Sequence, residues 1–223
     1  MILFGPSILI LLPAIILAAY AQWKVRSTYA RYSKVSAINR MTAQQAAERI
    51  LTGAAISDVT IESSQRKLSD HYDPRTKALR LSAPTSSSIA AIGVAAHEAG
   101  HAIQHARSYR PLSLRTAIVP IANFGSQLAF PLFFIGLFAR MQPLVTAGIL
   151  AFSAAVLFTL VTLPVEFDAS RRAIVALRDT AVVNEEELGG VKEVLFAAAL
   201  TYVAAAAMAA LQLLMLLSVN RRR

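Results

Sequence analysis

Four long uncharged segments constrain the fold of this chain more than any other feature. No charged residue occurs in residues 2–20, 117–139, 144–163 or 194–219. Each segment approaches or exceeds the roughly 20 apolar residues that a helix needs to cross a bilayer. The sequence therefore predicts a mainly α membrane protein with about four transmembrane helices.

Composition and charge distribution favour the same class. Hydrophobic residues make up 56% of the 223 residues, more than an ordinary soluble protein contains. The net charge is +9, and 11 of the 22 lysines and arginines lie between Lys24 and Arg80, directly after the first apolar segment. By the positive-inside rule this region is cytoplasmic and the N-terminus is outside. We therefore expect the lipid bilayer as a partner and no nucleic acid.

The apolar segments divide the chain into five predicted parts. Only Arg140–Pro143 separates the second and third segments, so these two form a tight antiparallel hairpin. The basic end of the chain then falls outside, against the positive-inside rule. Either the basic residues after the first segment outweigh it, as we expect, or the last segment does not fully cross. The predicted parts are a first transmembrane helix at 1–23, a cytoplasmic α+β part at 24–115, a transmembrane hairpin at 116–164, a cytoplasmic helical part at 165–190, and a fourth transmembrane helix with a basic tail at 191–223. Within 165–190 we expect a helix that extends the third segment to about residue 178, followed by an acidic turn at 185–187.

Local signals predict the secondary structure of the α+β part. Thr42 and Gln45 form a capping box, which favours a short helix over residues 43–52. Residues 58–62 alternate polar and apolar as a strand does, and residues 66–72 and 77–82 flank a turn signal at Asp73-Pro74-Arg75, which predicts a β-hairpin. A serine-rich loop then begins a helix at residue 89 that ends before Pro111.

That last helix contains a metal-binding motif, His97-Glu98-Ala99-Gly100-His101. Two histidines four residues apart lie on one face of a helix, one turn above the other, so both imidazoles can bind one metal ion. Glu98 is placed to act on a water at that ion, which is the arrangement of zinc metalloproteases. The chain has no cysteine, so the remaining ligand must be His, Asp or Glu.

The next histidine along the helix, His105, is a poor third ligand. Histidines eight residues apart are about 12 Å apart along a straight helix, too far for one ion with bonds of about 2 Å. We expect His105 to support the site through a hydrogen bond instead. A metzincin pattern would place Gly at 104 and His at 107, where this chain has Gln104 and Arg107.

Glu166 is the favoured third ligand. It follows the third apolar segment, which returns the chain to the predicted side of the His97 helix. Asp168 and Asp179 are weaker alternatives, because Asp168 points off the Glu166 face and Asp179 lies near the helix end. A carboxylate here can also simply stabilise a helix start.

Six segments carry a resemblance that runs in order over nearly the whole chain: DHYDPR at 70–75, LRLS at 79–82, SIAAIGVAAHEAGHAIQH at 88–105, PIANFGS at 120–126, LPVEFDASRR at 163–172 and ALTYVA at 199–204. In these segments the chain resembles the bacterial membrane neutral zinc metallopeptidases of the YugP type. The resemblance implies the bacterial cytoplasmic membrane and a gluzincin-like site, similar to membrane zinc proteases related to the CAAX-processing and heat-shock enzymes. In those relatives the third ligand begins a Glu-x-x-Ala-Asp pattern, and here Ser170 replaces the aspartate.

These observations predict a zinc-dependent endopeptidase that cleaves peptide or protein substrates, membrane proteins among them, at the cytoplasmic membrane surface. One Zn²⁺ is held by His97, His101 and Glu166, and Glu98 activates the attacking water. Residues 77–82 are expected to bind the substrate backbone as an added strand. The alternative is a catalytically silent membrane scaffold or quality-control partner with a structural zinc site. Candidate oxyanion donors are His71, Tyr72, Tyr109 and Arg171, and candidate supports of the ligands are His105 and Ser170.

Overall fold

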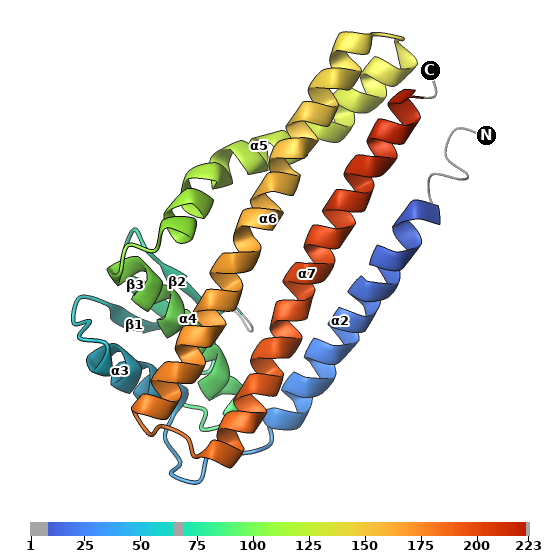
Figure 1. The fold of residues 1–223 in the computed structure, drawn as a ribbon. Helices are drawn as coiled ribbons and strands as arrows, with labels where there is room; N and C mark the ends of the chain where they lie inside the picture. The colour runs from blue at the N-terminus through green and yellow to red at the C-terminus, as the bar shows by residue number, and fades with distance from the viewer. Residues whose placement is uncertain (1–8, 65–68, 222–223) are drawn as a thin grey trace. The chain divides into compact units, whose positions relative to one another are not determined.

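The structure is a computed structural model that describes residues 9–64 and 69–221. Its described residues form two compact units, which we call the helical unit (9–22, 113–164 and 201–221) and the α+β unit (23–64, 69–112 and 165–200). In chain order the elements are η1 (Leu9–Leu11), α2 (Leu12–Tyr32), α3 (Ala43–Gly53), β1 (Thr60–Ser63), β2 (His71–Asp73), β3 (Ala78–Leu81), α4 (Ile89–Ala106), α5 (Arg110–Phe138), α6 (Gln142–Asp179) and α7 (Glu185–Arg221) (Figure 1).

Within the part of the chain that the structure describes, four helices are long and apolar enough to cross a membrane. The stretch Leu9–Tyr32 and the helices α5, α6 and α7 meet this condition by length and composition. The prediction of a mainly α membrane protein with a small α+β part is confirmed. The predicted first segment begins at residue 2, and residues 2–8 lie outside the described residues.

The helical unit contains the predicted hairpin of α5 and α6. α5 ends at Phe138 and α6 begins at Gln142, so the connection is as short as the sequence predicted. Glycines let the two backbones approach closely: a Cβ on Gly148 would lie 2.6 Å from the Phe133 backbone nitrogen. Phe133 is fully buried in a cluster that also contains Leu216 of α7.

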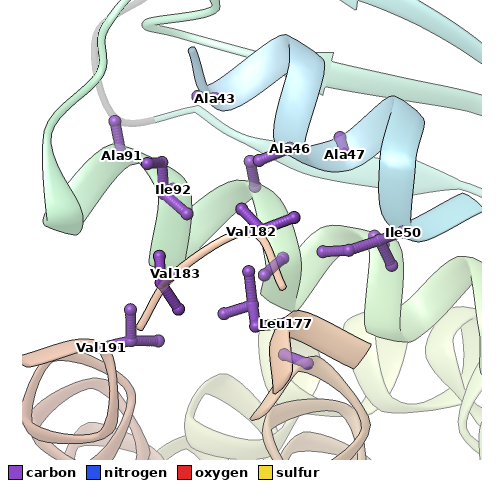
Figure 2. Close-up of a cluster of buried hydrophobic side chains, with 14 of the residues drawn as sticks. Ala43, Ala46, Ala47, Ile50, Ala91, Ile92, Leu177, Val182, Val183 and Val191 are labelled. Carbon is purple, nitrogen blue, oxygen red and sulfur yellow. The ribbon is translucent and has the colours of Figure 1, made fainter. Parts of the chain in front are cut away.

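The α+β unit has its core between short helices and the connection of α6 to α7. The capping box of α3 is confirmed, because Thr42 Oγ1 accepts from the Gln45 backbone N–H at 3.2 Å and Gln45 Oε1 accepts from the Thr42 N–H at 2.9 Å. The apolar face that this box orients packs on α4. Figure 2 shows the packing of Ala43, Ala46, Ala47 and Ile50 of α3, Ala91 and Ile92 of α4, Leu177 of α6, Val182 and Val183 of the connection, and Val191 of α7.

The sheet differs from the prediction in one respect that bears on function. The predicted hairpin is confirmed as the antiparallel pair of β2 and β3, with Tyr72 opposite Leu79. β2 begins at His71, and residues 66–68 of the predicted strand lie outside the described residues. β1 also pairs with β3, in parallel, so β3 is the central strand. The expectation that residues 77–82 bind substrate as an added strand is therefore wrong, because both edges of β3 are occupied. β2, not β3, is an edge strand of the sheet in the described residues, and it contacts α4.

A second correction concerns the acidic residues at 185–187. They form the first turn of α7 and not a separate turn. Asn184 caps this helix: its Oδ1 accepts from the Glu187 N–H at 2.8 Å, and Glu187 Oε2 accepts from the Asn184 N–H at 2.9 Å. Acidic side chains at a helix N-terminus interact favourably with the helix dipole, which explains why this polar run is helical. By contrast, the predicted helix after Pro164 is confirmed as a continuation of α6.

Candidate metal centre

His97 and His101 lie one turn apart on the same face of α4, as predicted. The helix begins after Ser88, whose Oγ accepts from the Ala91 N–H at 3.2 Å. The two imidazole rings meet edge to face, with centroids 4.8 Å apart and an interplanar angle of 83°. His101 is buried, with 8% of its surface exposed, and His97 is partly buried, with 14% of its side chain exposed.

Glu166 of α6 completes a three-residue cluster. Its Oε2 lies 3.2 Å from His97 Nε2 and 3.8 Å from His101 Nε2. One ligand atom of each residue lies within 4.8 Å of the other two. Glu166 is 2% exposed, and a buried carboxylate requires partners of this kind. The structure thus brings the predicted third ligand to the two histidines.

Gly100 explains how α6 comes so close to the motif. A Cβ on Gly100 would lie 2.4 Å from the backbone oxygen of Ala169. Ala169 is three residues after Glu166 and is fully buried. Any larger residue at this position of the motif would therefore push α6, and the Glu166 carboxylate with it, away from the histidines.

The second ring nitrogen of each histidine has its own hydrogen-bond partner. His97 Nδ1 lies 3.1 Å from Ser170 Oγ, and His101 Nδ1 lies 3.0 Å from Gln104 Oε1. When Nδ1 donates, Nε2 keeps its lone pair, which is the form of imidazole that binds a metal. The hydroxyl of Ser170 therefore reaches the ligand that the resemblance implied an aspartate would support.

Gln104 is a residue that the sequence analysis did not predict. It is fully buried, and its Nε2 donates to the Val165 backbone oxygen at 2.8 Å and to Asp168 Oδ2 at 2.9 Å. These two acceptors fix the amide orientation, so Oε1 faces His101 and accepts its Nδ1–H. Its position three residues after His101, on the same helix face, was the available signal.

Glu98 is held beside the sheet. It is 9% exposed, and its Oε2 accepts a hydrogen bond from the Tyr72 backbone N–H at 2.9 Å. Tyr72 belongs to β2, the edge strand, and this N–H points away from β3. The candidate base is thus hydrogen-bonded to the outer edge of β2.

The remaining predicted residues pair with other groups. His105 Nδ1 lies 2.8 Å from the Tyr72 hydroxyl, which agrees with a supporting role. Burial first, and then the charges of Asp58 and Asp73, raise the pKa of Tyr72 to about 12, so its hydroxyl stays protonated and can donate.

Which residue supplies the oxyanion donor stays a prediction. His71 is exposed, and its Nδ1 lies 2.8 Å from the Ser69 backbone oxygen. Arg171 donates to Asp168 at 2.9 Å, and Asp168 also pairs with Arg172. The Tyr109 ring lies under the Arg172 guanidinium, with its centroid 5.5 Å away.

The electrostatics of the cluster favour positive charge. Burial acts to lower the pKa of His101, but its hydrogen bond to Glu166 and the negative charges of Glu98 and Glu166 raise that pKa above its ordinary value. Two buried carboxylates therefore attract a cation to this position. A metal ion competes with a proton there, so its binding weakens as the pH falls.

Comparison with known proteins identifies the family. A family model described as "Putative neutral zinc metallopeptidase" matches residues 7–221, nearly the whole chain. The chain belongs to this family. A Bacillus subtilis (strain 168) protein named "Putative membrane protease YugP" is 46% identical over 209 residues, which cover 93% of each chain. No solved structure matches the chain.

The donor set fits the zinc ion named in the description of this metallopeptidase family. Two imidazoles and one carboxylate form a standard ligand set of catalytic zinc, with a fourth position left for water. Ligand atoms at bonds of about 2 Å in a tetrahedron lie about 3.4 Å apart. The measured separations of Glu166 Oε2 from the histidine nitrogens, 3.2 Å and 3.8 Å, lie on either side of that value.

Proposed function

We propose that this metallopeptidase-family member is a membrane-embedded, zinc-dependent endopeptidase of the gluzincin type. The observation that supports it most is the cluster of His97, His101 and Glu166 together with a second buried glutamate, Glu98, which directly follows His97 in the motif. One glutamate can bind a metal while the other handles protons. Peptide hydrolysis needs both functions.

The proposed roles follow from the hydrogen bonds. His97, His101 and Glu166 hold one zinc ion, and Ser170 and Gln104 orient the two imidazoles. When bound, zinc supplies a Lewis acid that lowers the pKa of a coordinated water to about 7.

Glu98 takes the proton from the attacking water and delivers it to the leaving amine. The Tyr72 N–H occupies Glu98 Oε2, so Oε1 is the atom proposed to carry the proton.

The outer edge of β2 is the proposed binding position for the substrate backbone, through the Tyr72 carbonyl, because the Tyr72 N–H already donates to Glu98. An extended peptide can pair with an exposed sheet edge through main-chain hydrogen bonds. Tyr72 lies in this strand and contacts Glu98. A peptide added at β2 would therefore lie beside the candidate base.

The site is proposed to act at the cytoplasmic membrane surface. Glu166 lies three residues after Leu163, where the third uncharged segment ends. The basic residues that follow the first segment favour a cytoplasmic location of the α+β unit. Substrates would then be cytoplasmic tails and loops of membrane proteins, or unfolded segments near the bilayer.

The experiment that tests the function is a Glu98→Gln substitution. We expect the variant to keep its zinc and to lose at least about 100-fold in hydrolysis of a denatured protein, because general-base catalysis contributes about 10²–10⁴-fold. Zinc per chain and cleavage rate are measured on the same preparation. Glu48→Gln is the control, since Glu48 is exposed on α3 and bonded only to Gln44 in the described residues, and it should change neither quantity.

The competing interpretation, a silent scaffold with structural zinc, predicts a different result. A structural site does not depend on a proton-transfer group. Unchanged properties of Glu98→Gln, or a zinc-loaded wild type that hydrolyses no peptide, would favour the scaffold.

A further inference from the structure

A cavity of about 290 Å³ lies within the α+β unit, apart from the metal cluster. Residues of α3, α4 and α6 line it, and none of them is a proposed metal ligand or base. Ile50, Ile103 and Val175 supply apolar wall. The charged lining residues are Arg107, Arg171, Arg172 and Asp179.

Three arginines line this one cavity, which concentrates positive charge there. Arg171 and Arg172 are partly neutralised, because Asp168 accepts from Arg171 Nη2 at 2.9 Å and from Arg172 Nε at 2.5 Å. Arg107, at the end of α4, has no side-chain hydrogen bond or ion pair among the residues that the structure describes. Its guanidinium donors are therefore open to a ligand.

We propose that this cavity binds a phosphate-bearing anion, from a lipid headgroup or from a soluble molecule. A guanidinium presents a planar fork of donors that matches the oxygens of phosphate. A carboxylate has two oxygens and is satisfied by one such fork. A phosphate group has more acceptor oxygens and more charge, so it can be shared by Arg107 and its two neighbours.

The surroundings of the chain make such anions abundant. Basic pockets beside membrane helices on the cytoplasmic side are typical sites for anionic lipid headgroups. The apolar wall formed by Ile50, Ile103 and Val175 can contact the part of the ligand that is not phosphate. The acidic lining residue Asp179 repels an anion, so removal of its charge should strengthen anion binding.

The cavity is also linked to the metal cluster through hydrogen bonds. Arg172 bonds Asp168, Asp168 accepts from Gln104, and Gln104 accepts from His101. The anion site does not require peptidase activity, however, and its test does not use it.

The test measures binding of three probes to the purified full-length protein in neutral detergent. The probes are dihexanoyl phosphatidylglycerol, dihexanoyl phosphatidylcholine and inorganic phosphate, each followed by calorimetric titration. We expect Arg107→Gln to weaken binding of the anionic probe at least 10-fold and Asp179→Asn to strengthen it. Arg178→Gln is the control, because Arg178 lies on α6 outside the cavity and pairs with Glu185 at the surface.

The outcomes distinguish the source of the phosphate. Binding of phosphatidylglycerol alone identifies a lipid headgroup, and equal binding of inorganic phosphate identifies a soluble ligand. Equal binding of both lipids that is insensitive to Arg107→Gln would overturn the proposal, as would absence of binding by every probe. Zinc content is measured in each variant and should be unchanged, so failure here is distinct from failure of the metal site.

Discussion

Ser170 stands where the resemblance implies an aspartate, and its side chain still contacts the proposed metal ligand His97. The resemblance implies aspartate at this position, yet the Ser170 hydroxyl still lies 3.1 Å from His97 Nδ1. A hydroxyl can accept that N–H, but it lacks the negative charge with which a carboxylate raises the basicity of the ring. Ser170 should therefore orient His97 with less electrostatic support.

We predict that Ser170→Ala lowers zinc affinity by about 10-fold or more and that Ser170→Asp restores it, because hydrogen-bond partners of ligands typically contribute about 10–100-fold. Competition with a chelator of known affinity measures the change. Ser153→Ala is a matched control on α6, since the Ser153 hydroxyl bonds only the Ile149 carbonyl of its own helix in the described residues. Equal affinities of Ser170→Ala and wild type would rule out this role.

Individual ligands were predictable where local geometry decided them. The spacing of His97 and His101, and the distance that excludes His105, follow from the dimensions of a helix. Gln104 was not predictable in the same way. Its role depends on Val165 and Asp168, which lie 61 and 64 residues away in the chain and reach it only after α6 has packed on α4.

At the scale of elements, the contact between α4 and α6 at Gly100 determines whether the cluster can form. We predict that Gly100→Ala destabilises the protein by about 1–3 kcal/mol and lowers zinc occupancy, because its Cβ would lie 2.4 Å from the Ala169 oxygen. Thermal unfolding in detergent and zinc content are the measurements.

The control for this substitution is Gly189→Ala on α7. A Cβ there meets nothing within 4 Å. In a helix interior alanine is more favourable than glycine by up to about 1 kcal/mol of folding free energy, so this variant should be at least as stable as the wild type. If Gly100→Ala behaved like Gly189→Ala, close packing of α4 on α6 would not be what holds Glu166 in place.

The elements themselves were largely predictable from local signals, and their partners were not. Capping at Thr42 and Ser88 placed the starts of α3 and α4 correctly. The parallel pairing of β1 with β3 escaped prediction, because alternation of polar and apolar residues does not specify which strand is the neighbour. The run at 185–187 was misread since acidic residues occur both in turns and in the first turn of a helix.

At the scale of the whole molecule, the charge distribution predicts which side of the membrane each loop faces. The chain has no cysteine, so single cysteines can report this directly. We expect Arg75→Cys, at the turn after β2, to react with an impermeant maleimide only after the cells are opened. Met141→Cys, between α5 and α6, should react in intact cells. Both positions are exposed, so a reversed pattern would mean that the positive-inside argument gives the wrong orientation.

The zinc content of Glu166→Ala tests the central claim most directly. We predict about one zinc per chain in the wild type and loss of most of it in Glu166→Ala, because two histidines alone leave the ion without its third protein ligand. Glu48→Ala, with the same change on the exposed face of α3, should keep the metal. If Glu166→Ala bound zinc at full stoichiometry and cleaved substrate normally, Glu166 would not be the third ligand and the proposed site would be wrong.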